Sequence, residues 1–517
     1  MSRPIATVAE VDDETLERFR ARRHDVVQES EPVEEHADGT TTLVYGIEEG
    51  PFTHYERRLE VEPSADGAHT VRQVVDCRLG VGAWWVLFAP PLRRVLRRPG
   101  GSSPWWAPPD VLDSQAAASL GSLAYLSLIG GYLGTLITQS LTYAADEFSA
   151  TDAQQANTLA VIRIGVLLSL LIANWADKHG RRRALLACAV GGVVMTGLGA
   201  LSPGLVALGG TQIVARGLAT ALGLLIVVVV AEEMPAGSRA YGVSLLTMSG
   251  ALGAGMVLWL LPLVEIDEQA WRGLYIVPLL FLFLIGPTAK LLPESRRFAR
   301  RHPDAHFGGH YRRLLLLAGT TLALAVLSTP ASQLQNEFLR DKFDFSATQI
   351  TLFTVLTVTP ASIGIVVGGR LADRRGKRLV GGIGLGVGAV LTAGQYVTDV
   401  PAILWGSAAV GSVFGGLAVP AMAVYGPELF PTSLRTRANV VITIMGVSGS
   451  VIGLLISGQL SKQWELGPSI AVLAVAPVLA VLLLIPQYPE TAHKELEELN
   501  PEDAVDSVGS ASVVPPV

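Results

Sequence analysis

The sequence contains little cysteine, little charge and no nucleotide-binding signature. Its two cysteines, Cys77 and Cys188, form no disulfide or metal-binding pattern. Only 16% of the residues are charged, whereas soluble domains carry about 25%. No glycine-rich loop ends in the lysine that holds a nucleotide phosphate, and no cluster of nucleophile and base is visible. These absences argue against an ATP-driven protein, an enzyme or a nucleic-acid binder, and we expect no cofactor and no metal.

Apolar residues are instead abundant and grouped. Half of the 517 residues are hydrophobic, and the mean hydropathy is +0.42. Between about residues 116 and 486, apolar stretches of roughly 20 residues follow one another, each long enough to cross a ~30 Å hydrocarbon core as a helix. They lack the alternation of barrel strands. Twelve such spans are centred near Leu126, Val166, Val193, Leu222, Leu252, Leu280, Ala325, Val355, Leu385, Val410, Gly446 and Val475.

Charged motifs in this region occur twice, always at the same distance. Asp177 and Asp373 both follow a span and precede a glycine and basic residues, and 373 − 177 = 196. The same offset relates Glu232 to Glu428, Pro235 to Pro431, Arg239 to Arg435, and Glu294 to Glu490. Insertions would have broken a common offset, so one unit is present twice in parallel order. The sequence therefore predicts an all-α membrane protein of twelve transmembrane helices, arranged as two six-helix repeats.

The basic residues predict the orientation. Loops after even-numbered spans are rich in arginine and lysine, whereas the opposite loops contain only Arg272, Arg340, Lys342 and Lys462. Short basic loops remain in the cytoplasm, so both termini are expected there, in a plasma (inner) membrane. The first 39 residues are polar and lack the apolar core of a signal peptide.

These observations divide the chain into six parts. We expect a cytoplasmic α+β extension at 1–98, a linker at 99–115, the first six-helix half at 116–294, a cytoplasmic interhalf loop at 295–312, the second half at 313–490 and a cytoplasmic tail at 491–517.

The duplicated loop motifs carry a family resemblance. Asp177-Lys178-His179-Gly180-Arg181-Arg182 and its copy ending in Asp373-Arg374-Arg375-Gly376-Lys377-Arg378 resemble the loop signature of the major facilitator superfamily. Arg216-Gly217, the paired Glu-x-x-Pro-x-x-x-Arg segments, Pro293-Glu294-Ser295 and Pro489-Glu490-Thr491 look like the sugar-porter branch. The resemblance spans about residues 116–499. It implies a monomeric transporter that moves a small organic solute across the lipid bilayer by alternating access.

The motif residues are predicted to form a cytoplasmic gate. Opposite charges at the helix ends can join the two halves when the cavity faces outward and separate when it faces inward. Exposed ion pairs contribute only about 0.2–1 kcal/mol each, so a stable gate needs several. The expected members are Asp177, Gly180, Arg181, Arg182, Glu232, Arg239, Glu294, Asp373, Gly376, Lys377, Arg378, Glu428, Arg435 and Glu490. The alternative is that the basic residues only fix the topology.

Polar stripes at helical spacing are the candidates for contact with solute or a coupling ion. They are Tyr132, Thr135 and Gln139 in the first span, Gln212, Arg216 and Thr220 in the fourth, and Thr329, Gln333 and Asn336 in the seventh, together with Arg163 in the second. Such residues also join membrane helices by hydrogen bonds, which is the structural alternative. A charge inside the bilayer costs at least ~2.5–3.5 kcal/mol, so Arg216 in particular requires a role.

The sequence departs from the sugar-porter pattern in three places. The first span has no acidic residue at 130–134, the seventh has Gln333-Leu334-Gln335-Asn336 in place of the family's sugar-binding motif, and Ala173 replaces the first glycine of one loop signature. Coupling to H⁺ or another ion therefore stays open. An exporter of organic ions, drugs or hydrophobic compounds is an alternative, and a transporter-like sensor is an alternative of another class.

The first ~100 residues form a separate problem. Between residues 40 and 79, side chains alternate as in strands, with Tyr55 and Leu59 opposite in phase to Glu56 and Arg58. An amphipathic segment follows at 84–98. Together they faintly resemble a polyketide-cyclase or START-like domain. The extension is either a module that binds an apolar ligand or docks on the inner leaflet, or a structural appendage.

Overall fold

The computed structural model describes residues 4–37, 40–63, 69–150, 154, 158, 161–162, 165–294 and 307–504. Arg163, most of the predicted interhalf loop and residues 505–517 lie outside this part. The chain divides into two compact units. Unit 1 comprises Met1–Tyr125, Glu233–Pro235 and Gly286–Pro293, and unit 2 comprises Leu126–Glu232, Ala236–Ile285 and Glu294–Val517.

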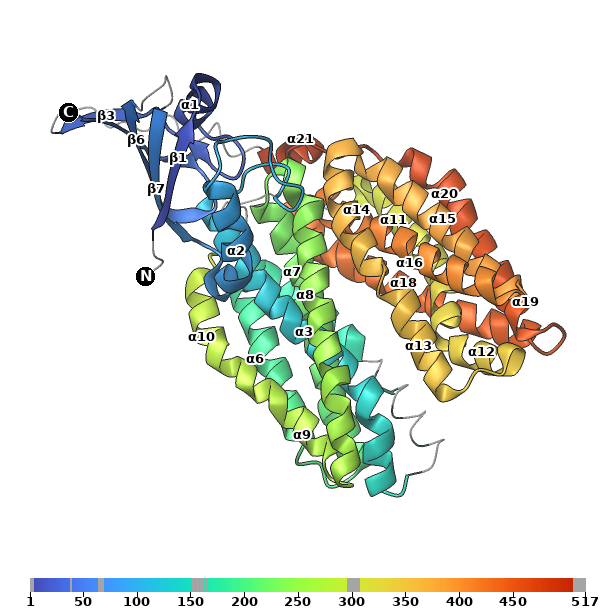
Figure 1. The fold of residues 1–517 in the computed structure, drawn as a ribbon. Coiled ribbons are helices and arrows are strands. Elements are labelled where there is room, and N and C mark those ends of the chain that lie inside the picture. Colours follow the sequence, from blue (N-terminus) through green and yellow to red (C-terminus); the bar gives the residue numbers. More distant parts are fainter. Residues whose placement is uncertain are drawn as a thin grey trace, which may run out of the picture. The chain divides into compact units, whose positions relative to one another are not determined.

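An antiparallel sheet forms most of the N-terminal extension (Figure 1). Its strands lie in the order β1-β7-β6-β4-β3, and a two-stranded sheet joins β2 to β5. The strands are β1 Ile5–Val11, β2 Gln28–Glu29, β3 Val33–Ala37, β4 Thr40–Tyr45, β5 Ile47–Glu49, β6 Phe52–Pro63 and β7 His69–Leu79. The predicted α+β extension is confirmed.

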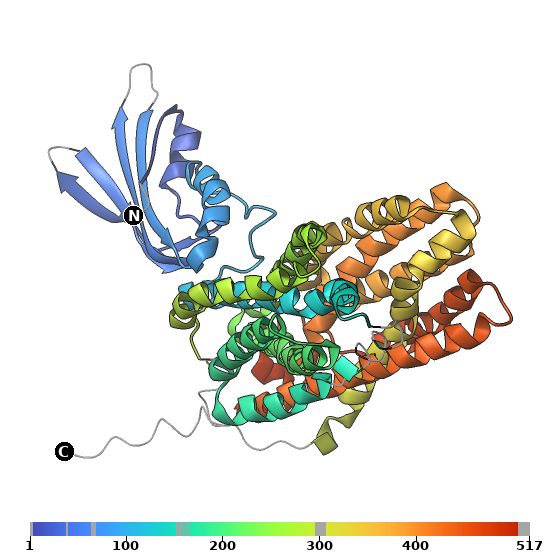
Figure 2. The same ribbon diagram turned by 90° about the horizontal axis from the view of Figure 1, so that it is seen from below.

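Two helices cover one face of this sheet, as Figure 2 shows. Helix α1 (Asp13–Arg20) buries Leu16 and Phe19 beside Leu59 of β6. Helix α2 (Trp85–Leu96) buries Leu92 and Leu96 beside Tyr55. Tyr55 and Leu59 are four residues apart on β6 and so point to the same face. The predicted phase of this strand is therefore confirmed.

A buried polar network also lies between the helices and the sheet. The carboxylate of Glu29 binds the Arg57 guanidinium at 2.7 Å and accepts a hydrogen bond of 2.6 Å from the Tyr55 hydroxyl. Arg57 also donates to the Phe19 carbonyl oxygen at 2.7 Å. Burial and the neighbouring Glu29 charge raise the pKa of Tyr55. Because Glu29 and Arg57 are almost fully buried, the pair stabilises the fold only while both partners are present.

Eleven helices among the described residues are long and apolar enough to cross a membrane. The first half contains α3 Ser114–Glu147, α5 Leu168–His179, α6 Arg181–Gly199, α7 Leu205–Glu233, α8 Arg239–Leu260, α9 Trp271–Ile276 and α10 Leu282–Leu291. The second contains α11 Tyr311–Gln333, α12 Gln335–Phe343, α13 Ala347–Val358, α14 Ala361–Arg375, α15 Lys377–Val397, α16 Pro401–Ala423, α17 Tyr425–Glu428, α18 Thr432–Leu460, α19 Leu466–Ala471 and α20 Val475–Leu483.

The remaining predicted span is the second. Its final part is α5, while much of residues 151–164 lies outside the described residues. The other eleven spans occur in the predicted order, six to a half when α5 is included. The structure thus confirms the predicted helical membrane fold.

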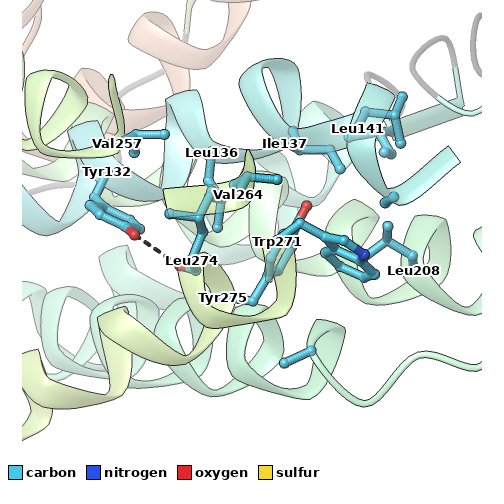
Figure 3. Close-up of a cluster of buried hydrophobic side chains, with 13 residues drawn as sticks. Tyr132, Leu136, Ile137, Leu141, Leu208, Val257, Val264, Trp271, Leu274 and Tyr275 are labelled. Carbon is cyan, nitrogen blue, oxygen red and sulfur yellow. Dashed lines mark hydrogen bonds between the residues drawn. The ribbon is translucent and has the colours of Figure 1, made fainter. Parts of the chain in front are cut away.

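Each half has its own packed interior. In the first half, Tyr132, Trp271 and Tyr275 are fully buried in a cluster that joins α3, α8 and α9 (Figure 3). Backbones also approach closely: a Cβ added to Gly131 of α3 would lie 1.9 Å from the carbonyl oxygen of Gly250 in α8. Small residues allow such contact between membrane helices. Each half therefore has the packing of a stable six-helix body.

Candidate functional site

The two glycines of the duplicated loop motifs make identical turns. Gly180 ends α5 with φ 103°, and Gly376 ends α14 with φ 105°. Only glycine adopts such angles without strain, and the turn exposes the first backbone amides of the next helix. Glu294 accepts from the amides of Arg181 and Arg182 at 2.9 and 3.1 Å. Glu490 accepts from those of Lys377 and Arg378 at 3.0 and 3.3 Å. Each glutamate thus caps a helix in its own half.

The basic residue after each glycine turns into its own half. Lys377 lies 2.6 Å from Glu428 and 4.0 Å from Asp373. Its equivalent, Arg181, contacts Glu232 and lies 3.9 Å from Asp177. The side chains of Arg181, Glu232, Lys377 and Glu428 are at most 1% exposed. We call the helix ends that carry these residues the motif face.

Two buried ion pairs cross from one half to the other at the motif face. Arg435 of α18 lies 2.6 Å from Glu232 at the end of α7. Arg239 of α8 lies 3.3 Å from Glu428 of α17. The four side chains are fully buried. Because removing one partner of a buried pair costs about 3–5 kcal/mol, these contacts can hold two helical bodies together.

The two motif aspartates also reach the opposite half, in different ways. Asp373 accepts hydrogen bonds from the backbone amides of Ala240 and Tyr241 at 3.1 and 2.8 Å, and so caps α8. Asp177 instead accepts from the side-chain hydroxyl of Thr436 at 2.9 Å. The contact of α14 with α8 is therefore built differently from that of α5 with α18.

The neighbouring small residues show the same asymmetry. A Cβ added to Gly369 of α14 would lie 2.7 Å from the Ser244 hydroxyl and 2.8 Å from the Ala240 carbonyl oxygen. The equivalent residue on α5 is Ala173. Glycine permits a closer approach of helices than alanine does. The missing glycine of the first motif thus lies on the helix that meets α18.

The sequence analysis missed the residues that follow the last span. Asp503 accepts from the backbone amide of Thr432 at 3.0 Å and lies 3.2 Å from Arg435. Asn500 donates to the Glu428 carbonyl oxygen at 2.8 Å, and Glu495 lies 3.3 Å from Arg239. Residues 491–504 therefore complete the charge network. Three acidic or amide side chains after a Pro-Glu-Thr motif were the available signal, but their spacing does not indicate their partners.

Ion pairs at the opposite helix ends stay within a half. Glu147 of α3 binds Arg272 of α9 at 2.8 Å and accepts from the Trp271 indole at 2.6 Å. Lys342 and Asp399 form a 2.7 Å pair inside the second half. Among the described residues, the ion pairs that join the halves lie at the motif face. In Figure 1 the ribbons of the two halves meet near α8 and α14 and diverge toward α9 and α12.

Several predicted solute-contact residues take part in helix packing. Tyr132 is buried, and its hydroxyl donates to the Leu274 carbonyl oxygen at 2.8 Å (Figure 3). Arg216 of α7 donates to the carbonyl oxygen of Gly134 in α3. Thr329 of α11 bonds Ser450 of α18 at 2.8 Å. These three side chains join helices in this structure.

The other candidates differ in exposure. Gln212 is buried at 2% exposed, and Thr220 bonds the carbonyl oxygen of its own helix, four residues earlier, at 2.9 Å. Thr135 and Gln139 are half-buried, while Gln333 and Asn336 are exposed. These last four are the stripe residues with exposed surface for a solute. No group of three histidine, cysteine or acidic residues suited to a metal occurs within the described part of the chain.

This architecture, two equivalent six-helix bodies joined at one end by a charge network, defines a membrane transporter fold. Residues 314–515 match the family model of the Major Facilitator Superfamily. A putative metabolite transport protein of Haemophilus influenzae (strain ATCC 51907 / DSM 11121 / KW20 / Rd) is 26% identical over 423 residues, which are 73% of this chain and 99% of the relative.

Solved structures share the fold. The human organic anion transporter MFSD10 (TETRAN) aligns with a TM-score of 0.59 at 14% identity, covering 71% of this chain and 99% of its own. The proton:xylose symporter XylE, bound to 6-bromo-6-deoxy-D-glucose, aligns with a TM-score of 0.60 at 18% identity, covering 75% and 98%. The chain belongs to the major facilitator superfamily, as the loop motifs predicted.

Proposed function

We propose that this protein transports a small organic solute by alternating access, and that the motif-face network closes one side of the pathway. The observation that carries the proposal is the pair of buried bridges, Arg435 to Glu232 and Arg239 to Glu428, that join the halves at one end only within the described residues. Several coupled contacts of this kind form a two-state element, since they are made or broken together. The basic loops place this face in the cytoplasm.

The solute class follows from the relatives and from the residues with exposed surface. The Haemophilus relative carries a metabolite-transport description, and XylE is a sugar symporter. Gln139, Gln333 and Asn336 offer amide groups that match the hydroxyls of a sugar-like metabolite. The first span has no carboxylate at 130–134 to carry a proton. A sugar-like or other polar metabolite is therefore the proposed solute, with a coupling ion still to be found.

An organic anion is the second candidate. Arg216 places a guanidinium beside Gly134 within the first half, and a neighbour of the same fold is an organic anion transporter. A guanidinium binds carboxylates and phosphates in a bidentate manner. The anion would compete with the Gly134 carbonyl oxygen for Arg216.

Flux through purified protein tests the proposal. The chain is reconstituted in vesicles, and counterflow of labelled pentoses, hexoses and organic carboxylates is measured at two pH values. Saturable flux of a sugar that is lost in Gln333→Ala supports the first candidate. Carboxylate flux lost in Arg216→Gln supports the second. Binding of a solute without any net flux would favour a sensor and overturn the proposal.

A further inference from the structure

Helix α2 has an exposed face that the packing of the N-terminal extension does not use. Its buried side is made by Leu92 and Leu96, which pack on the sheet. At 100° per residue the opposite side carries Val86, Leu87, Pro90, Arg93, Arg94 and Arg97, all of them exposed. Trp85, Val86 and Leu87 are 51%, 59% and 64% exposed. Three consecutive large apolar side chains on a surface indicate a binding partner.

The start of α2 is fixed to the ends of two predicted membrane helices within unit 1. The Trp84 indole donates to the Gly121 carbonyl oxygen in α3 at 2.9 Å. A Cβ added to Gly121 would lie 2.5 Å from the Val81 carbonyl oxygen, so the backbones are in direct contact. Gly82 has φ 62° and lies against Leu291, the last residue of α10. The apolar turn of α2 therefore adjoins the helix ends that border the lipid.

Polarity changes along the exposed face in the order of a lipid leaflet. Val86 and Leu87 come first, beside the membrane helices, and Arg93 follows seven residues after Val86, about 10 Å farther along the helix. Apolar side chains insert at the acyl boundary, while arginines bind lipid phosphates. We infer that α2 is an interfacial anchor, which inserts Trp85, Val86 and Leu87 into the leaflet at the motif face and binds anionic phospholipid through Arg93, Arg94 and Arg97. This inference is independent of the transported solute.

Depth measurements on the full-length protein test the anchor. Cys77 and Cys188 are replaced, and one spin label is attached at Leu87→Cys, with Val33→Cys on β3 as the matched control because Val33 is 63% exposed. The protein is placed in lipid nanodiscs that contain phosphatidylglycerol. The expected result is that the label at position 87 is reached by oxygen and protected several-fold from a water-soluble nickel chelate. The label at position 33 should show the reverse.

Two further arms separate the alternatives. Substitution of Arg93, Arg94 and Arg97 by glutamine, or nanodiscs of neutral lipid alone, should increase the nickel accessibility at position 87 toward that of the control. Equal protection in neutral discs would overturn the role of anionic lipid. Equal nickel accessibility at positions 87 and 33 would overturn the anchor altogether, and spin–spin broadening at position 87 would assign the face to a second copy of the chain instead.

Discussion

The guanidinium of Arg435 lies 2.6 Å from the carboxylate of Glu232, although the two residues are 203 positions apart and belong to different halves. The same carboxylate contacts Arg181 of its own half. Its equivalent, Glu428, likewise joins Lys377 to Arg239 of the other half. Each half therefore contributes one buried glutamate that holds an internal and a foreign cation together. Loss of either glutamate would leave two buried cations facing each other.

Glu232→Gln should open the motif face. The amide cannot balance Arg181 and Arg435, and breaking a buried pair costs about 3–5 kcal/mol, enough to shift a two-state equilibrium by a hundredfold or more. We expect solute flux to fall and a cysteine reporter at Asn439, on α18 near the network, to become accessible to a water-soluble maleimide. Arg340→Gln, which removes an exposed pair with Asp341, is the control and should change neither quantity. An unchanged reporter in the Glu232 variant would refute the gate.

Gly369 and its equivalent Ala173 should respond in opposite ways. Gly369→Ala places a methyl group 2.7 Å from the Ser244 hydroxyl and 2.8 Å from a backbone oxygen, so α14 and α8 must separate. Overpacking of this kind costs typically 1–3 kcal/mol. Ala173→Gly removes a methyl group and should preserve the closed motif face. Reporter accessibility at this face is the measurement, and Gly210→Ala is the control because nothing lies within 4 Å of its added Cβ. Equal accessibility in all three variants would contradict the account.

The duplicated motifs predicted the fold because each carries information about its own half. The offset between Asp177 and Asp373 established two repeats, and the apolar runs established the helices. The pairing across the halves was less predictable. Equivalent aspartates bind differently, Asp373 to backbone amides and Asp177 to a side chain, since the pairing depends on the approach of whole helices.

The stripe residues show a second limit. Helical spacing grouped Tyr132 with Thr135 and Gln139, but the structure turns the tyrosine hydroxyl toward Leu274 and leaves the other two half-buried. Hydrogen bonding to a neighbouring helix and contact with a solute require the same residue types. Sequence spacing alone therefore could not separate them.

The thiol of Cys77 should react slowly with alkylating reagents. Burial, with a smaller contribution from the Asp76 carboxylate, raises its pKa to about 11. At pH 8 its thiolate fraction is on the order of a hundredfold below that of an ordinary cysteine. In a Cys188→Ala background, the rate of iodoacetamide labelling should rise about tenfold per pH unit from 8 to 10. The denatured chain is the control and should label rapidly at pH 8. A folded-state rate that levels off above pH 9 would contradict the raised pKa.

Asp503→Asn should weaken the closed motif face from its last described segment. The wild-type carboxylate caps α18 through the Thr432 amide and hydroxyl, at 3.0 Å each, and balances the buried Arg435 at 3.2 Å. Loss of a helix cap alone costs about 0.5–2 kcal/mol, and the neutral amide also leaves more of the Arg435 charge to Glu232. We expect a lower thermal stability and partial opening in the reporter assay, smaller than in the Glu232 variant. Glu498→Gln changes an exposed carboxylate of the same segment and should have neither effect. If both variants behave alike, residues 491–504 do not hold the halves together, and the two cross-half bridges must act without them.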